Sequence, residues 1–160
     1  MATDIFAKIG DIKGESRDAK HKDEVEVLSW SWGVSQTGSM GPGGGGGAGK
    51  PNFTDFTFTH HIDKASPLLM AACATGKHIK DATITNRKAG KGQQEFLIIK
   101  MNDILITSVQ PSLSGGEGGV ENVSLTLAKV DLEYRRLQMK DGSLDAGVHF
   151  KYDIKLNKEG

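Results

Sequence analysis

The chain has 160 residues, and its 20 basic and 20 acidic side chains give a formal net charge of zero. This length suits one domain that buries roughly two-thirds of its surface. The charge balance excludes a global field that would attract nucleic acid or anionic lipid, so neither is an expected partner. One cysteine excludes an internal disulfide and a multi-cysteine metal site. Residues 68–74 form the longest apolar run, too short for membrane insertion, and the first residues lack the pattern of a standard export signal.

Alternation of apolar and polar residues with period two dominates the chain and indicates β-strands. In chain order, the predicted strands cover residues 5–9, 24–33, 53–60, 82–87, 95–101, 103–109, 120–132 and 148–156. The last of these alternates most regularly and predicts a strand with one face in water. The segment 120–132 changes its apolar phase partway, which predicts a bulge or a bend. Residues 96–99 are apolar on both faces, so we expect that strand to be buried on both sides.

One segment has the composition of a helix. Ser66 is a suitable cap, Pro67 fits the first turn, residues 68–74 are mostly helix formers, and Gly76 can end the helix. About eight short strands and one helix predict a mainly β protein, an antiparallel β-barrel of two curved sheets with one flanking α-helix. Residues 1–160 are expected to form a single domain with an extended glycine-rich loop at about residues 41–50.

Glycine is over-represented, with 21 residues, and the excess lies in two windows, 41–49 and 115–119. Residues 44–50 (GGGGAGK) are one residue short of a phosphate-binding loop. That motif needs Ser or Thr after the lysine and then a helix, whereas Pro51 and a predicted strand follow here, so nucleotide binding is not expected. The first window is too long for a hairpin turn, and ordering its glycines is costly, so we expect it to become ordered against a partner.

The sequence shows no arrangement of residues that predicts catalysis, a metal site or a cofactor. Cys73 lies in an apolar helical segment and is interpreted as a small core residue. His60 and His61 are adjacent on a strand, so they point to opposite faces and cannot share a metal. Two classes remain open, a structural subunit and an enzyme or small-ligand barrel. An enzyme would need titratable groups gathered in a cleft, and a ligand barrel would need an apolar pocket in a monomer.

Eight short stretches along nearly the whole chain carry a specific resemblance when they are taken together and in order: residues 11–18 (DIKGESRD), 27–33 (VLSWSWG), 43–50 (ending GAGK), 56–67 (FTFTHHIDKASP), 72–79 (ACATGKHI), 87–90 (RKAG), 121–125 (ENVSL) and 128–130 (AKV). They resemble the haemolysin-coregulated protein (Hcp) family, the tube subunit of bacterial type VI secretion systems. The one departure noted is His60-His61, where relatives often carry other residues, commonly a lysine. Some family members continue into a C-terminal toxin domain, whereas this sequence ends just after the last predicted strand, so the resemblance implies the plain tube form.

The resemblance implies a non-enzymatic structural function without cofactors. Members form hexameric rings that stack into a hollow tube, and the tube is itself secreted from the bacterial cytoplasm without a signal peptide. Its partners would be further copies of the chain, effector proteins carried in the lumen, and the sheath and spike proteins of the apparatus. We expect the loop to stack rings, through Gly43, Gly44, Gly45, Gly46, Gly47, Ala48, Gly49 and Lys50.

Strand alternation in residues 25–32 indicates which side chains of this segment could line the lumen. It places Leu28, Trp30 and Trp32 on one face, and the apolar mass of the tryptophans predicts that this face turns to the core. Ser29 and Ser31 then point away from the core, together with Val25 and Val27. Small hydroxyl side chains suit a wide polar lumen, whereas an ordinary solvated outer wall is the alternative.

Overall fold

The computed structural model describes residues 2–38, 49–90, 92–136 and 146–160, which are mostly strand. The described residues contain one helix, α1 (Ala65–Thr75). The strands are β1 (Thr3–Ile9), β2 (Val25–Ser31), β3 (Val34–Ser35), β4 (Asn52–Phe53), β5 (Phe56–His61), β6 (His78–Lys88), β7 (Glu95–Ser112), β8 (Val120–Tyr134), β9 (Val148–Asp153) and β10 (Lys158–Glu159).

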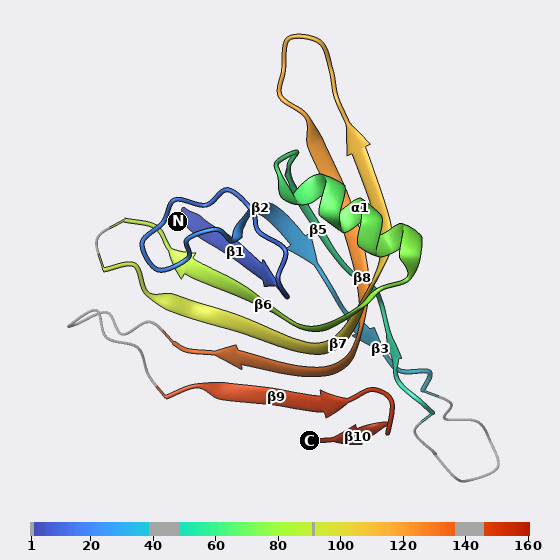
Figure 1. Ribbon diagram of the computed structural model, residues 1–160. Coiled ribbons are helices and arrows are strands. Elements are labelled where there is room, and N and C mark those ends of the chain that lie inside the picture. The colour runs from blue at the N-terminus through green and yellow to red at the C-terminus, as the bar shows by residue number, and fades with distance from the viewer. Residues whose placement is uncertain (1, 39–48, 91, 137–145) are drawn as a thin grey trace, which may run out of the picture.

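Six strands close into an antiparallel barrel (Figure 1). The sheet runs β10-β9-β8-β5-β2-β1-β6-β7, and a further pairing of β8 with β7 joins its two sides. β9 and β10 continue the sheet beyond the barrel, and β3 pairs with β4 in a separate two-stranded sheet. Helix α1 packs against β7. The predicted fold class, a β-barrel with one flanking helix, is confirmed.

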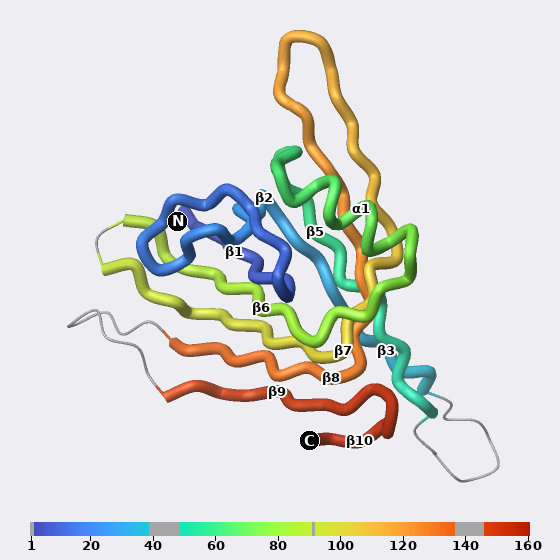
Figure 2. Tube along the Cα trace, in the orientation of Figure 1, coloured from blue at the N-terminus to red at the C-terminus, as the bar shows by residue number. Residues whose placement is uncertain are grey.

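β8 bends, as its change of apolar phase predicts. Leu127 and Ala128 are consecutive, yet both are buried, so the strand changes the face that it turns to the core. Opposite this point on β7, Asp103 has a positive φ of 52°. Residues 120–125 of β8 pair with β5, whereas residues 129–134 pair with β9. Figure 2 shows β7 and β8 turning together between these two parts.

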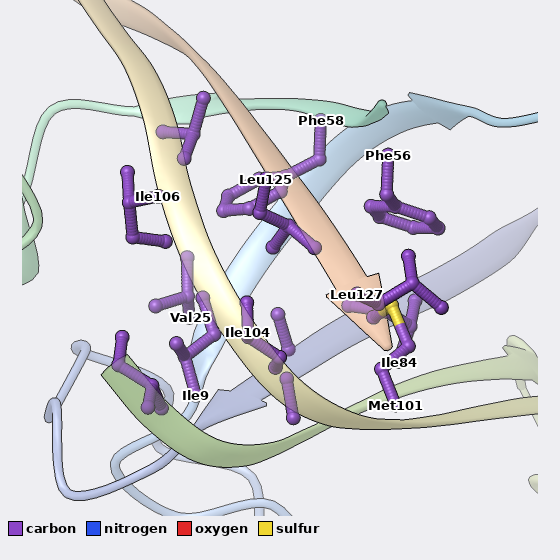
Figure 3. Packing of buried hydrophobic residues seen from close by; sticks show 14 of the residues in the cluster. Ile9, Val25, Phe56, Phe58, Ile84, Met101, Ile104, Ile106, Leu125 and Leu127 are labelled. Atoms are coloured by element: carbon purple, nitrogen blue, oxygen red, sulfur yellow. The ribbon is translucent and has the colours of Figure 1, made fainter. Parts of the chain in front are cut away.

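The barrel interior is filled by aliphatic and aromatic side chains from all six strands (Figure 3). Phe56 and Phe58 of β5 are at most 1% exposed, and burying each such side chain contributes roughly 1.5–3 kcal/mol. In β7, Ile98 and Ile99 are buried as predicted. The prediction is wrong for Phe96 and Leu97, which are only half-buried because they lie near the start of the strand, close to one end of the barrel.

Helix α1 ends as predicted and begins differently. Gly76 has a left-handed φ of 65° and donates its N–H to the last turn, which is a common helix ending for glycine. The prediction that Ser66 caps the start is wrong, because Lys64 occupies the cap position. Asp63 Oδ1 instead accepts the Ala65 N–H at 2.8 Å, and Ser66 Oγ accepts the Asp63 N–H at 3.1 Å. Within the described residues, no helix is long and apolar enough to cross a membrane.

The C-terminal strand is shorter than its alternating pattern predicts. β9 ends at Asp153, whose carboxylate accepts the Leu156 N–H at 2.9 Å and so stabilises a turn. Asn157 has a positive φ of 53° and accepts the Tyr152 hydroxyl at 2.7 Å. The chain then reverses, and β10 pairs with the end of β9. The strand ends earlier than predicted because the hydrogen bond from the Leu156 N–H to the Asp153 carboxylate competes with continuation of the strand.

The segment between β1 and β2 is held to the outside of the barrel by one buried arginine. Arg87 of β6 is 2% exposed and donates two hydrogen bonds to Asp18, at 2.9 and 2.8 Å, and one to Asp4 at 3.2 Å. The guanidinium also lies 4.8 Å from the centre of the Phe6 ring, against which His21 stacks. The bidentate pair thereby joins residues 11–18 and 87–90, two of the stretches that resemble the Hcp family.

This pair predicts a pH dependence of stability. The hydrogen bonds from Arg87 lower the pKa of Asp18 from 3.8 to about 2. Because the folded-state value lies below the ordinary one, the stabilisation is complete above the ordinary value and is lost as the pH falls through the folded-state value. We expect Asp18→Asn to lower the melting temperature at neutral pH. Between pH 3.8 and about 2, the melting temperature of this variant should fall less steeply with decreasing pH than that of wild type. Asp11→Asn, in the same segment, is the control, and thermal denaturation across pH is the measurement. Equal pH profiles for wild type and Asp18→Asn would contradict this account.

Candidate interaction surfaces

Ser29 and Ser31 are exposed, but the two faces of β2 do not follow a simple alternation along the whole strand. Val25 and Val27, predicted on the serine face, are buried, whereas Leu28, predicted on the core face, is 50% exposed. The pairing of β2 with β5 shifts register between Val27 and Ser29. This irregularity inserts Leu28 as an extra residue and exchanges the two faces of the strand. The assignment of Val25, Val27 and Leu28 is therefore corrected.

The two tryptophans do turn toward the core. Trp30 stacks on Phe56 with ring centres 5.4 Å apart and donates its indole N–H to Asn86 at 2.8 Å. Trp32 stacks on Phe53 at 5.6 Å. Both rings pack against the buried cluster, so the serines that alternate with them point outward.

Ser29 and Ser31 belong to a wider surface of small uncharged polar side chains. Register places Ser29 opposite Thr59 and Ser31 opposite Thr57. The same two threonines lie opposite residues of β8. We call this set the neutral face; it comprises Ser29, Ser31, Thr57, Thr59, Asn122 and Ser124.

Hydrogen bonds between strands hold four of the six side chains of the neutral face. The Thr57 and Ser124 hydroxyls are 3.0 Å apart, and the Thr59 hydroxyl donates to Asn122 Oδ1 at 2.6 Å. Groups paired in this way are already partly satisfied, and none of the six side chains carries a charge. The neutral face therefore supplies no acid, base or nucleophile pair, and it suits weak contacts rather than catalysis.

Most of the predicted stacking loop lies outside the described residues, namely Gly43, Gly44, Gly45, Gly46, Gly47 and Ala48. Gly49 and Lys50 are described. A Cβ on Gly49 would lie 2.8 Å from Thr37 Oγ1, so the two described ends of this loop lie side by side. Lys50 is followed by Pro51 and β4, not by the helix that a phosphate-binding loop requires.

A second surface is apolar. Along β8 and β9 the core-facing side chains continue past the barrel, where less of the chain covers them. Val148 is 72% exposed, Phe150 37% and Tyr134 47%. We call these three residues the apolar strip; Tyr134 and Val148 are paired across the strands. The strip joins a row of aromatic rings, because Phe150 stacks on Tyr152 and Phe53.

The backbone beside the apolar strip is also open. β10 has only two residues, and it pairs with Tyr152 and Asp153 of β9. The Gly160 N–H adds one further bond to the Lys151 carbonyl. Within the described residues, the earlier part of β9 has no strand on the side away from β8. An unpaired strand edge next to exposed apolar side chains is a typical site of protein association.

Sequence reasoning missed a buried polar pair. His60 and Glu121 are both 0% exposed, with Nε2 and Oε1 2.8 Å apart. Asp63 Oδ2 lies 3.9 Å from His60 Nδ1, and burial raises the pKa of this carboxyl, opposed mainly by the hydrogen bond from the Ala65 N–H. The signal was present in the alternation, since Glu121 shares its phase with the apolar residues that follow on β8. His61 points to the opposite, exposed side, as predicted.

The other candidate chemical groups are dispersed. Among the residues that the structure describes, no group of three or more His, Cys, Asp and Glu side chains is arranged to hold a metal ion. Cys73 is half-buried and packs against the core cluster, consistent with its interpretation as a small packing residue.

Comparisons with known proteins identify the family. The family model described as "Type VI secretion system effector, Hcp" matches residues 6–134. Protein hcp1 of Pseudomonas aeruginosa is 51% identical over 160 residues, which cover 98% of each chain. The crystal structure of Hcp1 from Salmonella typhimurium is 40% identical, covers all of both chains and superposes with a TM-score of 0.83. A structure titled as that of a type six secretion system protein is 26% identical, with a TM-score of 0.92 over 99% of this chain and all of its own.

The predicted family resemblance is thus confirmed by sequence and by fold. The matched range holds both members of the Arg87–Asp18 ion pair and the whole neutral face. The chain belongs to the Hcp family of type VI secretion proteins.

Proposed function

We propose that this chain is a structural subunit of the type VI secretion tube. It assembles into hexameric rings, the rings stack into a hollow tube, and the tube is itself secreted and carries or protects effectors in its lumen. Sheath and spike proteins are its further partners. Assembly takes place in the cytoplasm, and the apparatus exports the tube without a signal peptide.

The exposure of the apolar strip is the observation that supports ring assembly. A strand side chain that is 72% exposed and apolar gains free energy when a neighbour covers it, by about 25 cal/mol for each Å² removed from water. The open edge of β9 beside it offers backbone groups to the same neighbour. In this proposal the neighbour is the next copy in the ring, an assignment that membership of the Hcp family supports.

Mass measurement of the purified chain tests this proposal. We expect a species near six times 17.1 kDa by native mass spectrometry. Val148→Ser with Phe150→Ser should shift the population toward monomer, because the buried apolar area at the contact is lost. Leu68→Ser, at a 49% exposed position on α1, is the matched control and should keep the ring. A wild-type chain that stays monomeric would contradict the tube function, whereas intact rings in the double variant would contradict only the strip's part in it.

The glycine-rich loop is proposed to join one ring to the next. The described ends of the loop are adjacent at Thr37 and Gly49, so a short turn can replace residues 40–48 without moving β3 or β4. We expect an Asn-Gly replacement to leave rings intact and to abolish tube stacking and secretion. Electron microscopy of the rings and detection of the chain in the culture medium measure the two effects. Normal tubes formed without the loop would exclude this function of Gly43, Gly44, Gly45, Gly46, Gly47 and Ala48.

The neutral face, including Ser29 and Ser31, is proposed to line the lumen. Uncharged side chains, four of which are already paired with one another, hold a passing protein only weakly, which suits a channel that loads and releases cargo. Ser31→Gln adds bulk without charge, and we expect rings to form normally while an effector co-purified with wild-type rings falls severalfold. Ser35→Gln, on exposed β3, is the control. An unchanged effector level beside intact Ser31→Gln rings would place the neutral face elsewhere.

A further inference from the structure

Strands β3 and β4 form a small pair at the base of the glycine-rich loop, and we call this pair the ribbon. Each of its strands has two residues, and the pair is a separate sheet from the barrel. Two strands alone are marginally stable in water and need packing against another element. Val34, Ser35 and Asn52 are exposed, whereas Phe53 is half-buried. The position of the ribbon therefore depends on what the Phe53 ring contacts.

The Phe53 ring lies among three other aromatic rings. Its centre is 5.6 Å from that of Trp32, 5.4 Å from that of Tyr152 and 6.5 Å from that of Phe150. Trp32 and Tyr152 pack against the core cluster, so they form the fixed side of this contact. Phe150 belongs to the apolar strip and is the most exposed of the three, at 37%. One side chain thus contacts the ribbon and also lies in the surface that the next copy is proposed to cover.

We propose that ring assembly positions the ribbon through the contact between Phe150 and Phe53, so that a subunit can stack only after it has entered a ring. This regulation rests on the proposed tube function, in which the apolar strip joins copies and the glycine-rich loop joins rings. The ribbon has two states. In the packed state Phe53 lies between Phe150 and Trp32, and in the released state it has left them.

The neighbouring copy favours the packed state for a physical reason. A Phe150 ring already held by Phe53 loses less conformational freedom when a neighbour covers it, so the packed state binds the neighbour more tightly. A ligand shifts a two-state equilibrium by its difference in affinity for the two states. Because the coupling is reciprocal, a packed ribbon stabilises the ring as much as the ring stabilises the packed ribbon.

The two tryptophans of the chain allow a direct test. Trp30→Phe leaves Trp32, which stacks on Phe53, as the fluorescent reporter. Emission and native mass spectra are recorded on the same dilution series. As rings form, Trp32 emission should shift to shorter wavelength and its quenching by acrylamide should fall, because Phe53 covers the indole. In the matched control, Trp32→Phe, the remaining Trp30 packs on buried Phe56 and should report no change.

A second variant tests the coupling itself. Phe53→Ala in the Trp30→Phe background should still form rings but should lose the change in Trp32 emission. Through the reciprocal coupling it should also raise the protein concentration at which half the rings dissociate, by roughly fivefold. Electron microscopy should show its rings unstacked. Val34→Ala, at the exposed ribbon position paired with Phe53, is the matched control and should behave as wild type does.

Thermal melting checks that each variant folds. If Trp30→Phe does not fold, hydrogen exchange of wild type replaces fluorescence. The Thr54 N–H, which donates to the Gly33 carbonyl at 2.9 Å beside the ribbon, should then exchange more slowly in rings than in monomers.

Three outcomes would overturn the proposal while leaving ring assembly intact. They are rings that form without a change in the ribbon signal, an emission change that persists in Phe53→Ala, and normal tubes built from Phe53→Ala rings. A chain that stays monomeric at every concentration would instead overturn both this proposal and the tube function. Ring mass measured on every sample separates the two cases.

Discussion

The pairing of β7 with β8 is the constraint on which the remaining structure depends. These long neighbouring strands close the barrel, and both turn at the point where Asp103 faces the buried Ala128. The turn gives β8 two sets of neighbours, β5 in its first part and β9 in its second. One strand therefore contributes to the barrel wall and to the sheet extension, which links the neutral face to the apolar strip through the same backbone.

Closure of the barrel decides which side chains meet solvent. Alternation along β5 and β8 sends phenylalanine, valine and leucine inward and threonine, serine and asparagine outward. Beyond the barrel the same inward side continues along β9 without a full cover, and apolar residues become exposed there. In the proposed function these two surfaces have different roles, the neutral face as a weakly adhesive wall of the lumen and the apolar strip as a contact between copies.

The same fold also determines which charged side chains pair with one another. Arg87 is buried on the outer side of the barrel wall and draws Asp18 and Asp4 toward it, while His21 lies between Glu24 and Glu95. A buried cation left without these carboxylates would be strongly destabilising, so the pairing is enforced by desolvation.

The sequence by itself predicted most of the barrel strands, the described helix and its glycine ending, the bend in β8 and the family, because periodicity and motifs are local properties of the chain. It also predicted that Ser29 and Ser31 point outward. Only the tertiary structure decided the faces of Val25, Val27 and Leu28, since a register shift against β5 depends on the partner strand. The His60–Glu121 pair and the Arg87–Asp18 ion pair likewise required the fold, because contacts between residues distant in sequence leave no periodic signal along the chain.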